Sequence, residues 1–207
     1  MKLKGSMRYS LIAVMLAIGL SIAPMSAHAL AILDFGDGIL ADGGVITWLG
    51  GNNSKGENIP IGVVNVSGAP NHNGVFIVTN GVLNYNTTLN TVSISGAIAD
   101  LGLGDMTLLS GSFTNFTTEY SPNASLNFRG VGPDEKARAL LVELGMNPLT
   151  PFDFYGFTLS GQPITETTFY ATSTDFKNTE VPEPATMLLL GSGLIGLAGF
   201  ARKRFKK

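Results

Sequence analysis

The sequence contains no cysteine, and this absence excludes several kinds of site at once. There is no thiolate to bind a metal, to act as a nucleophile, to carry a lipid or to form a disulfide. Histidine is almost as scarce, with two residues in 207, and only 14% of the chain is charged. Residues 30–180 carry 14 acidic and five basic side chains, a formal charge of −9. This acidic body argues against nucleic acid as a partner, because phosphates require a basic face.

The first 29 residues have the three-part order of a secretory signal peptide. The basic residues are Lys2, Lys4 and Arg8. An apolar run over 11–22 follows, and it is shorter than the roughly 17–25 residues that a membrane-spanning helix needs. Ala27 and Ala29 then give the small-x-small pattern that signal peptidase recognises, so Leu30 is the predicted first residue of the mature protein. We therefore expect export by the secretion machinery rather than an uncleaved N-terminal anchor.

The C-terminal 27 residues have a second ordered pattern. Pro182, Glu183 and Pro184 precede an uncharged stretch over 185–201, which as a helix would span about 26 Å, enough for a thin bilayer. A basic cluster follows, made of Arg202, Lys203, Arg204, Lys206 and Lys207. Because such clusters stay in the cytoplasm, the body is predicted to lie outside the inner membrane. Composition alone favours a plain single-pass anchor.

The order Pro-Glu-Pro, short glycine-rich apolar helix and terminal basic cluster closely resembles the PEP-CTERM sorting signal of exported bacterial proteins. The resemblance is confined to residues 181–207. It implies that an exosortase, a membrane-embedded protease or transpeptidase, cuts near Pro182, Glu183 and Pro184. It also implies a Gram-negative bacterium that makes exopolysaccharide, with the body released to the cell surface or extracellular matrix. In this interpretation the three motif residues are recognised by another enzyme and catalyse nothing.

Residues 30–180 have the composition of an exported β domain, with 17 threonines, 15 asparagines and 20 glycines. Short strand patterns recur about every ten residues, which predicts a mainly β, single-domain fold of the antiparallel β-sandwich or jelly-roll type. The predicted strands are 45–49, 62–67, 75–79, 82–86, 91–95, 106–110, 112–117, 125–129, 152–159 and 167–176.

Three local patterns add detail to this prediction. Asn80 and Gly81 between two strand patterns predict a tight hairpin turn. Residues 134–144 are predicted as one short helix, opened by Pro133 and closed by Gly145, whose apolar stripe would cover one end or edge of the sandwich. Residues 177–180 are predicted to be a short polar linker before the sorting signal.

Asp34, Asp37 and Asp42 are clustered among glycines near the predicted mature N-terminus. Clustered carboxylates can wrap a calcium ion, which prefers six to eight oxygen ligands. The spacing does not match an EF-hand loop, and Asp-Gly pairs also form ordinary turns. Because of this aspartate cluster, calcium is the one cofactor that the residues suggest.

Exposed aromatic side chains on a jelly roll can bind sugars, and Trp48 and Tyr155 are the candidates. Strict alternation over 152–157 would place Phe152 and Phe154 on the core face, and Tyr155 and Phe157 on the opposite, exposed face. Ordinary sheet packing explains the same residues without any ligand.

No pattern in the sequence identifies a catalytic centre. His72, the one histidine of the body, lies in a turn-like stretch, and no phosphate loop, nucleophile elbow or zinc-binding pair is present. The leading interpretation is a non-enzymatic surface or matrix protein whose partners are signal peptidase, exosortase, the inner membrane and exopolysaccharide. The alternatives are a carbohydrate-binding module of the matrix and a secreted polysaccharide-active enzyme.

Overall fold

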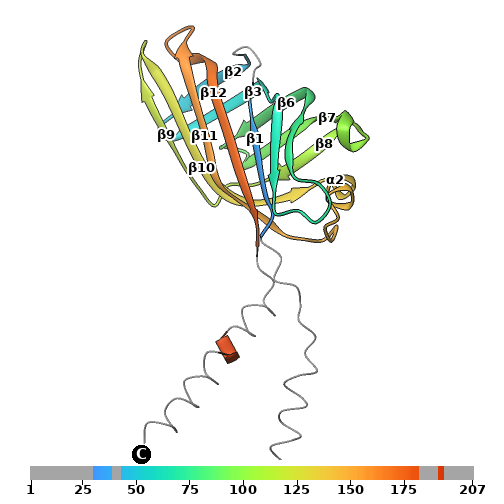
Figure 1. Cartoon of the computed structure of the whole chain (residues 1–207). Coiled ribbons are helices and arrows are strands. Elements are labelled where there is room, and N and C mark those ends of the chain that lie inside the picture. The colour runs from blue at the N-terminus through green and yellow to red at the C-terminus, as the bar shows by residue number, and fades with distance from the viewer. Residues whose placement is uncertain (1–29, 39–42, 182–190, 194–207) are drawn as a thin grey trace, which may run out of the picture.

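The computed structural model describes residues 30–38, 43–181 and 191–193, and almost all of this material is antiparallel β-sheet (Figure 1). A 3₁₀ turn (Ala99–Leu101) and a short helix, α2 (Arg138–Glu143), interrupt the strands. The strands are β1 (Ile32–Gly36), β2 (Val45–Gly50), β3 (Asn53–Pro60), β4 (Val63–Ser67), β5 (Gly74–Ile77), β6 (Thr79–Asn86), β7 (Thr91–Ile98), β8 (Leu103–Gly111), β9 (Asn115–Ser121), β10 (Ser125–Lys136), β11 (Phe152–Pro163) and β12 (Thr168–Glu180).

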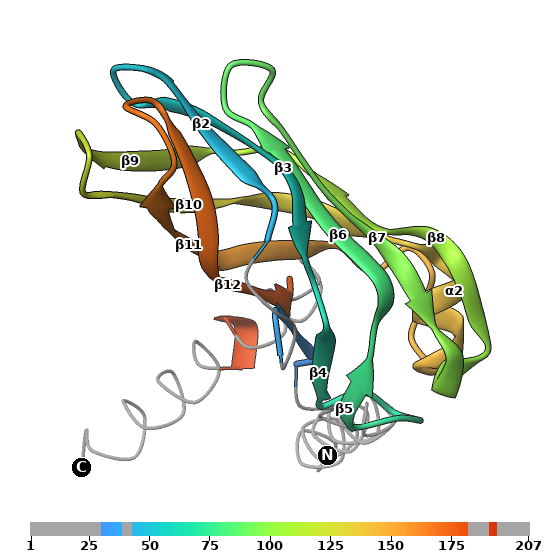
Figure 2. The same cartoon turned by 90° about the horizontal axis from the view of Figure 1, so that it is seen from above.

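Eight strands form a closed antiparallel barrel, in the order β11, β10, β8, β7, β6, β3, β2, β12 and back to β11 (Figure 2). β9 pairs with the first part of β10, while β1, β4 and β5 extend the sheet from the second half of β12. The predicted mainly β, antiparallel class is confirmed. The predicted two-sheet sandwich is corrected, because β12 pairs with β11 on one side and with β2 on the other, and this closes the sheet. Closure leaves no unpaired edge within the ring.

Phenylalanine fills the barrel interior. The seven largest fully buried side chains are Phe35, Phe128, Phe152, Phe154, Phe157, Phe169 and Phe176. Four of these rings pair in tilted arrangements, with centroids 4.9 Å apart for Phe154 and Phe176 and 5.0 Å apart for Phe128 and Phe157. Such aromatic pairs add to the stabilisation that burial itself gives.

The Asn80-Gly81 pair forms a β-bulge, not the predicted hairpin turn. β5 pairs with β4, and β6 pairs with β7 with a register shift between Thr79 and Val82. Asn80 has a positive φ of 53° within this bulge. A Cβ on Gly81 would lie 2.0 Å from the Ile61 carbonyl oxygen, so the close backbone approach requires glycine here.

Two further local predictions are wrong at their boundaries, and both errors concern strands. Pro133 and Asp134 belong to β10, which continues to Lys136, so α2 begins only at Arg138. The end of that helix is as predicted, with Gly145 at a φ of 76°. The predicted linker over 177–180 is the last part of β12. β10 and β12 therefore continue further along the chain than predicted, and their added C-terminal residues include polar ones.

β1 and β3 were not predicted from the sequence. β1 is short and contains one of the aspartates of the predicted calcium cluster. β3 has the sequence NSKGENIP, in which no apolar alternation marks a strand, and it is held by pairing with β2 and β6. Tertiary pairing rather than local preference therefore forms this strand.

The predicted membrane helix over 185–201 falls outside the described residues, except for 191–193, which are helical. Within the parts of the chain that the structure describes, no helix has the length and apolar character needed to cross a membrane.

Candidate functional site

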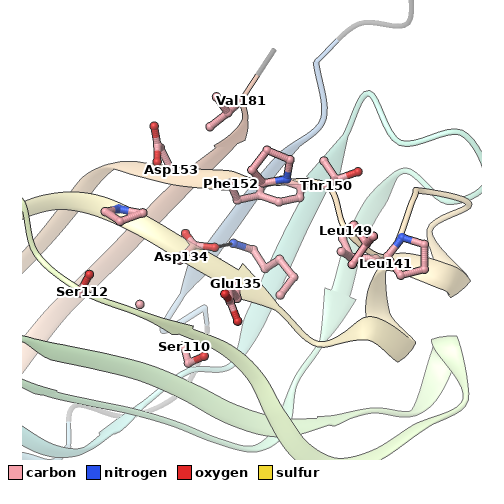
Figure 3. A pocket seen from close by; sticks show the side chains of 15 residues that line it. Ser110, Ser112, Asp134, Glu135, Leu141, Leu149, Thr150, Phe152, Asp153 and Val181 are labelled. Carbon is pink, nitrogen blue, oxygen red and sulfur yellow. Dashed lines mark hydrogen bonds and ion pairs between the residues drawn. The ribbon is translucent and has the colours of Figure 1, made fainter. Parts of the chain in front are cut away.

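A pocket of about 760 Å³ lies where β8, β10, β11 and the α2–β11 loop meet. Figure 3 shows Asp134 on β10 between Ser110 of β8 and Phe152 of β11, with Asp153 and Val181 close by. The remaining walls come from α2 and from the proline-containing loop over 148–151. The pocket therefore adjoins the last residue of the chain that the structure describes before Pro182.

Three polar side chains, Asp134, Lys136 and Asn178, meet on the inner face of the barrel at this end and form what we call the buried cluster. Asp134 accepts hydrogen bonds at both carboxylate oxygens, from Lys136 Nζ at Oδ1 and from Asn178 Nδ2 at Oδ2. Lys136 Nζ also lies 4.5 Å from the centre of the Phe152 ring. The side chains of Asp134 and Lys136 have no solvent exposure, and Asn178 is equally buried. The remaining amide oxygen, Asn178 Oδ1, has no hydrogen-bond partner within the described part of the chain.

Burial shifts the pKa values of the two charged members of the cluster in opposite directions. It raises the pKa of Asp134, and the opposing effects of the Lys136 charge and the Lys136 and Asn178 hydrogen bonds are smaller. It lowers the pKa of Lys136 to about 8, against the opposing attraction of Asp134. Both charged forms are disfavoured because the interior solvates them poorly. The neutral amine and the neutral carboxyl group are therefore much closer in free energy to the ion pair than they would be in water.

Period-two alternation explains how these side chains reach the interior. Along β10 every second residue is buried, from Leu126 through Phe128 and two glycines to Asp134 and Lys136. β12 buries Phe176 and Asn178 in the same way. None of the three members of the cluster was predicted as a site residue, because the local sequence indicates a helix at Asp134 and a linker at Asn178. Continuing the strand alternation past Arg129 would have placed Asp134 and Lys136 on the core face.

The two ends of the body lie side by side next to the buried cluster. The Glu180 N–H donates to the Ala31 carbonyl oxygen at 2.9 Å, and the Ala31 N–H donates to Glu180 Oε2 at 3.3 Å. The Val181 N–H donates to the Pro151 carbonyl oxygen at 2.9 Å. Regular hydrogen bonding of β12 thus continues up to Val181. Leu30, the predicted mature N-terminus, is the adjoining exposed residue.

The residues predicted to direct export and sorting lie mostly outside the described residues. This applies to Ala27, Ala29, Pro182, Glu183, Pro184, Arg202, Lys203, Arg204, Lys206 and Lys207. Their predicted roles rest on the sequence alone.

Of the predicted calcium ligands, Asp34 and Asp37 are described and Asp42 is not. Asp34 lies on β1 beside Asp175 and Lys177 of β12, with Lys177 Nζ 3.7 Å from Asp34 Oδ2 and 2.9 Å from Asp175 Oδ2. Burial and a hydrogen bond with Asp175 raise the pKa of Asp34 to about 6. Among the described residues no group of three or more carboxylates or histidines is arranged to hold a metal ion. Calcium binding remains a prediction.

The aromatic candidates have different surroundings. Trp48 stacks on Tyr120, with ring centroids 3.9 Å apart and planes 5° apart, so one face of its indole is covered. Tyr155 is exposed and lines a groove of about 230 Å³. Phe157 is buried, which corrects the prediction that it shares the exposed face with Tyr155. The reason is a bulge in β11 between Phe154 and Gly156, which shifts the alternation by one residue.

Comparison with known proteins supplies one match. Residues 180–204 match the family model of the PEP-CTERM protein-sorting motif. No curated protein and no solved structure matches the chain. The matched segment begins at Glu180, the last residue of β12, so the motif follows the barrel directly. The resemblance predicted from the sequence is confirmed: the chain carries a PEP-CTERM protein-sorting motif, confined to its C-terminal segment.

Proposed function

We propose that this protein is a non-enzymatic component of the cell surface or exopolysaccharide matrix, delivered there by exosortase processing of its C-terminal tail. The observation that carries the proposal is the PEP-CTERM match over residues 180–204. That motif indicates an exported protein whose sorting signal is anchored in a membrane and read by an exosortase. The site of cleavage would then lie immediately after a folded β-barrel.

The way β12 ends supports this arrangement. Its backbone is paired on both sides at Glu180, and Val181 makes one further backbone hydrogen bond, to the Pro151 carbonyl oxygen. Pro182 has no N–H to continue the ladder. A membrane protease must bind an unpaired backbone. The backbone would become available to it where the hydrogen bonds of the β-ladder end. The short distance between barrel and motif also holds the body close to the bilayer until it is released.

The C-terminal mass of the surface protein tests this proposal. Protein collected from the cell surface and the medium should lack every residue beyond the Pro-Glu-Pro region, because exosortase removes the apolar helix and basic cluster. The measurement is the mass of the C-terminal peptide in each cell fraction, with the full-length precursor in the inner membrane as reference. If surface protein retains Lys207, the tail is a plain anchor and the sorting role is wrong.

A second candidate function, binding of a matrix polysaccharide, is supported by the surroundings of Tyr155. The groove beside it is lined by the polar side chains of Asn115, Thr117, Arg129 and Thr158. An exposed aromatic ring beside polar groups and one cation is the kind of surface that stacks on a sugar and hydrogen-bonds its hydroxyl or acidic groups. Tyr155 is itself the extra residue of the β11 bulge, and its side chain is exposed.

Replacing Tyr155 by alanine should reduce the affinity for the matrix polysaccharide by about fivefold, because a stacked aromatic ring contributes on the order of 1 kcal/mol. The measurement is binding of the exported protein to a glycan array, with added calcium and with chelator. Tyr170→Ala, at another exposed tyrosine outside this groove, is the matched control and should bind normally. Equal binding by wild type and Tyr155→Ala would remove the groove as a sugar site.

A further inference from the structure

The buried cluster places a nucleophile, an amide and an acid–base group in contact inside the barrel. Lys136 supplies a primary amine, Asn178 supplies a carboxamide, and Asp134 contacts both through its two oxygens. None of the three side chains reaches solvent. A primary amine and a carboxamide that are held by the two oxygens of one carboxylate in a dry interior can react, with the amine replacing the amide nitrogen and the carboxylate transferring the protons.

We propose that Lys136 Nζ and Asn178 Cγ become joined by an amide bond that forms within the folded barrel, with Asp134 as the acid–base residue. The bond would link β10 to β12 across the intervening strand β11. It would bridge residues 42 positions apart and lie two residues before Glu180, where the sorting motif begins.

The chemistry balances without any co-reactant. The neutral Lys136 amine attacks Asn178 Cγ, and the new C–N bond forms as the carbonyl electrons move to Oδ1. Asp134 accepts a proton from Nζ and returns a proton to Nδ2 as the Cγ–Nδ2 bond breaks. Ammonia leaves, the carbonyl is restored, and Asp134 regains its starting protonation state. No oxidant or reductant is consumed, since one amide is exchanged for another.

Three features of the cluster favour this reaction over a permanent ion pair. Burial lowers the pKa of Lys136 to about 8 and raises that of Asp134, so the amine becomes neutral and nucleophilic more readily than an exposed lysine. Phe152 covers the amine at 4.5 Å and contributes to the exclusion of water, which would otherwise compete. Asp134 holds the amide of Asn178 by Nδ2, the atom that leaves as ammonia, while Asn178 Oδ1 has no hydrogen-bond partner in the described structure.

The physical benefit follows from the position of the bond. The chain has no cysteine, so a disulfide cannot secure the barrel outside the cell. β12 is the strand through which the body is attached to its membrane tail, and any force on the tail acts on β12 first. A covalent link from β12 to β10 would hold this strand in the barrel when its hydrogen bonds open, in the same way that a disulfide restricts an unfolded chain.

Peptide mass spectrometry of the full chain isolated from exporting cells tests the proposal. Trypsin cuts after Arg129, Arg138 and Lys177, but it cannot cut after an acylated Lys136. The expected product in most wild-type molecules is a branched peptide, in which residues 130–138 are joined to the peptide that begins at Asn178. Its mass should be about 17 Da below the summed linear masses, the mass of the ammonia lost. Quantitative recovery of free 130–136 and of a linear Asn178 peptide from wild type would overturn the proposal.

Variants separate the roles within the cluster. Lys136→Arg cannot form the bond, and Asp134→Asn keeps the size of the side chain but removes the acid–base group, so both should give linear peptides. Lys177→Arg changes the neighbouring, partly exposed lysine of the same strand and should keep the branch. A branched peptide in Asp134→Asn would overturn the assignment of Asp134. If either cluster variant fails to fold, the wild-type peptide still decides whether the bond exists.

Discussion

Replacing Asp134 by alanine is expected to lower the free energy of unfolding of the exported protein by about 3–5 kcal/mol. The substitution removes the carboxylate that accepts hydrogen bonds from both Lys136 and Asn178, and with it the acid–base group that the proposed amide bond requires, so that Lys136 stays a free amine. It leaves the Lys136 amine buried with no opposite charge beside it and creates a small cavity. A buried, uncompensated charge is among the most destabilising changes that a single substitution can make. The measurement is chemical denaturation, with the free energy extrapolated to zero denaturant.

Two further variants identify the cause of that loss. In Asp134→Ala combined with Lys136→Met no charge is left unpaired, so this double variant should be more stable than Asp134→Ala alone. Asp175→Ala breaks the partly exposed pair with Lys177, whose atoms are 2.9 Å apart, and should cost less than about 1 kcal/mol. If Asp134→Ala and Asp175→Ala lose equal stability, the buried cluster contributes no more than a surface ion pair.

Changing Pro182 and Glu183 together to alanine is expected to abolish C-terminal processing while leaving membrane insertion intact. Both prolines of the motif disfavour helix and lack a backbone donor, so the native sequence keeps residues 181–184 from extending the apolar helix upward. The change removes Pro182 and also Glu183, the single charge beside the membrane, while Pro184 stays in place. Processing is expected to fail because two of the three motif residues that the exosortase recognises are gone. The apolar stretch and the basic cluster are unchanged, so the precursor should still insert with its C-terminus inside. It should then accumulate at full length in the inner membrane.

The C-terminal peptide mass and the distribution between inner membrane, surface and medium measure this effect. Pro163→Ala with Glu166→Ala is the matched control: it removes the same two residue types from exposed positions at the β11–β12 hairpin. This control should be processed like wild type. Normal release of the Pro182 and Glu183 variant would show that the motif is a spacer and not a recognition element.

The sequence predicted most of the strands because their side chains alternate between core and solvent. β7 is a clear case: the pattern over 91–95 lies inside the observed Thr91–Ile98. β3 could not be predicted in this way, because its residues are largely polar and its strand conformation comes from two neighbouring strands. The Asn80-Gly81 prediction identified a site of positive φ correctly but assigned it to a turn, because local sequence does not reveal which strands pair.

The candidate site was missed for a related reason. Pro133 followed by two acids is a typical helix start, yet Asp134 pairs with Gly111 of β8 and Phe152 of β11. Residues 177–180 have the composition of a linker, yet all four pair with β11 and residues 177–179 also pair with β1. In both cases long-range pairing overrides a local preference whose free energy is small.

By itself the sequence determined the antiparallel β class and the C-terminal sorting motif, because alternation and the Pro-Glu-Pro, apolar and basic order are properties of contiguous residues. Only the tertiary structure decided that the sheet closes into a barrel and that Asp134, Lys136 and Asn178 meet. Asp134 and Asn178 are 44 residues apart, and strand pairing alone brings them together. The altered pKa values of Asp134 and Lys136 also come from the fold, because water is excluded only once β10, β11 and β12 have closed around them.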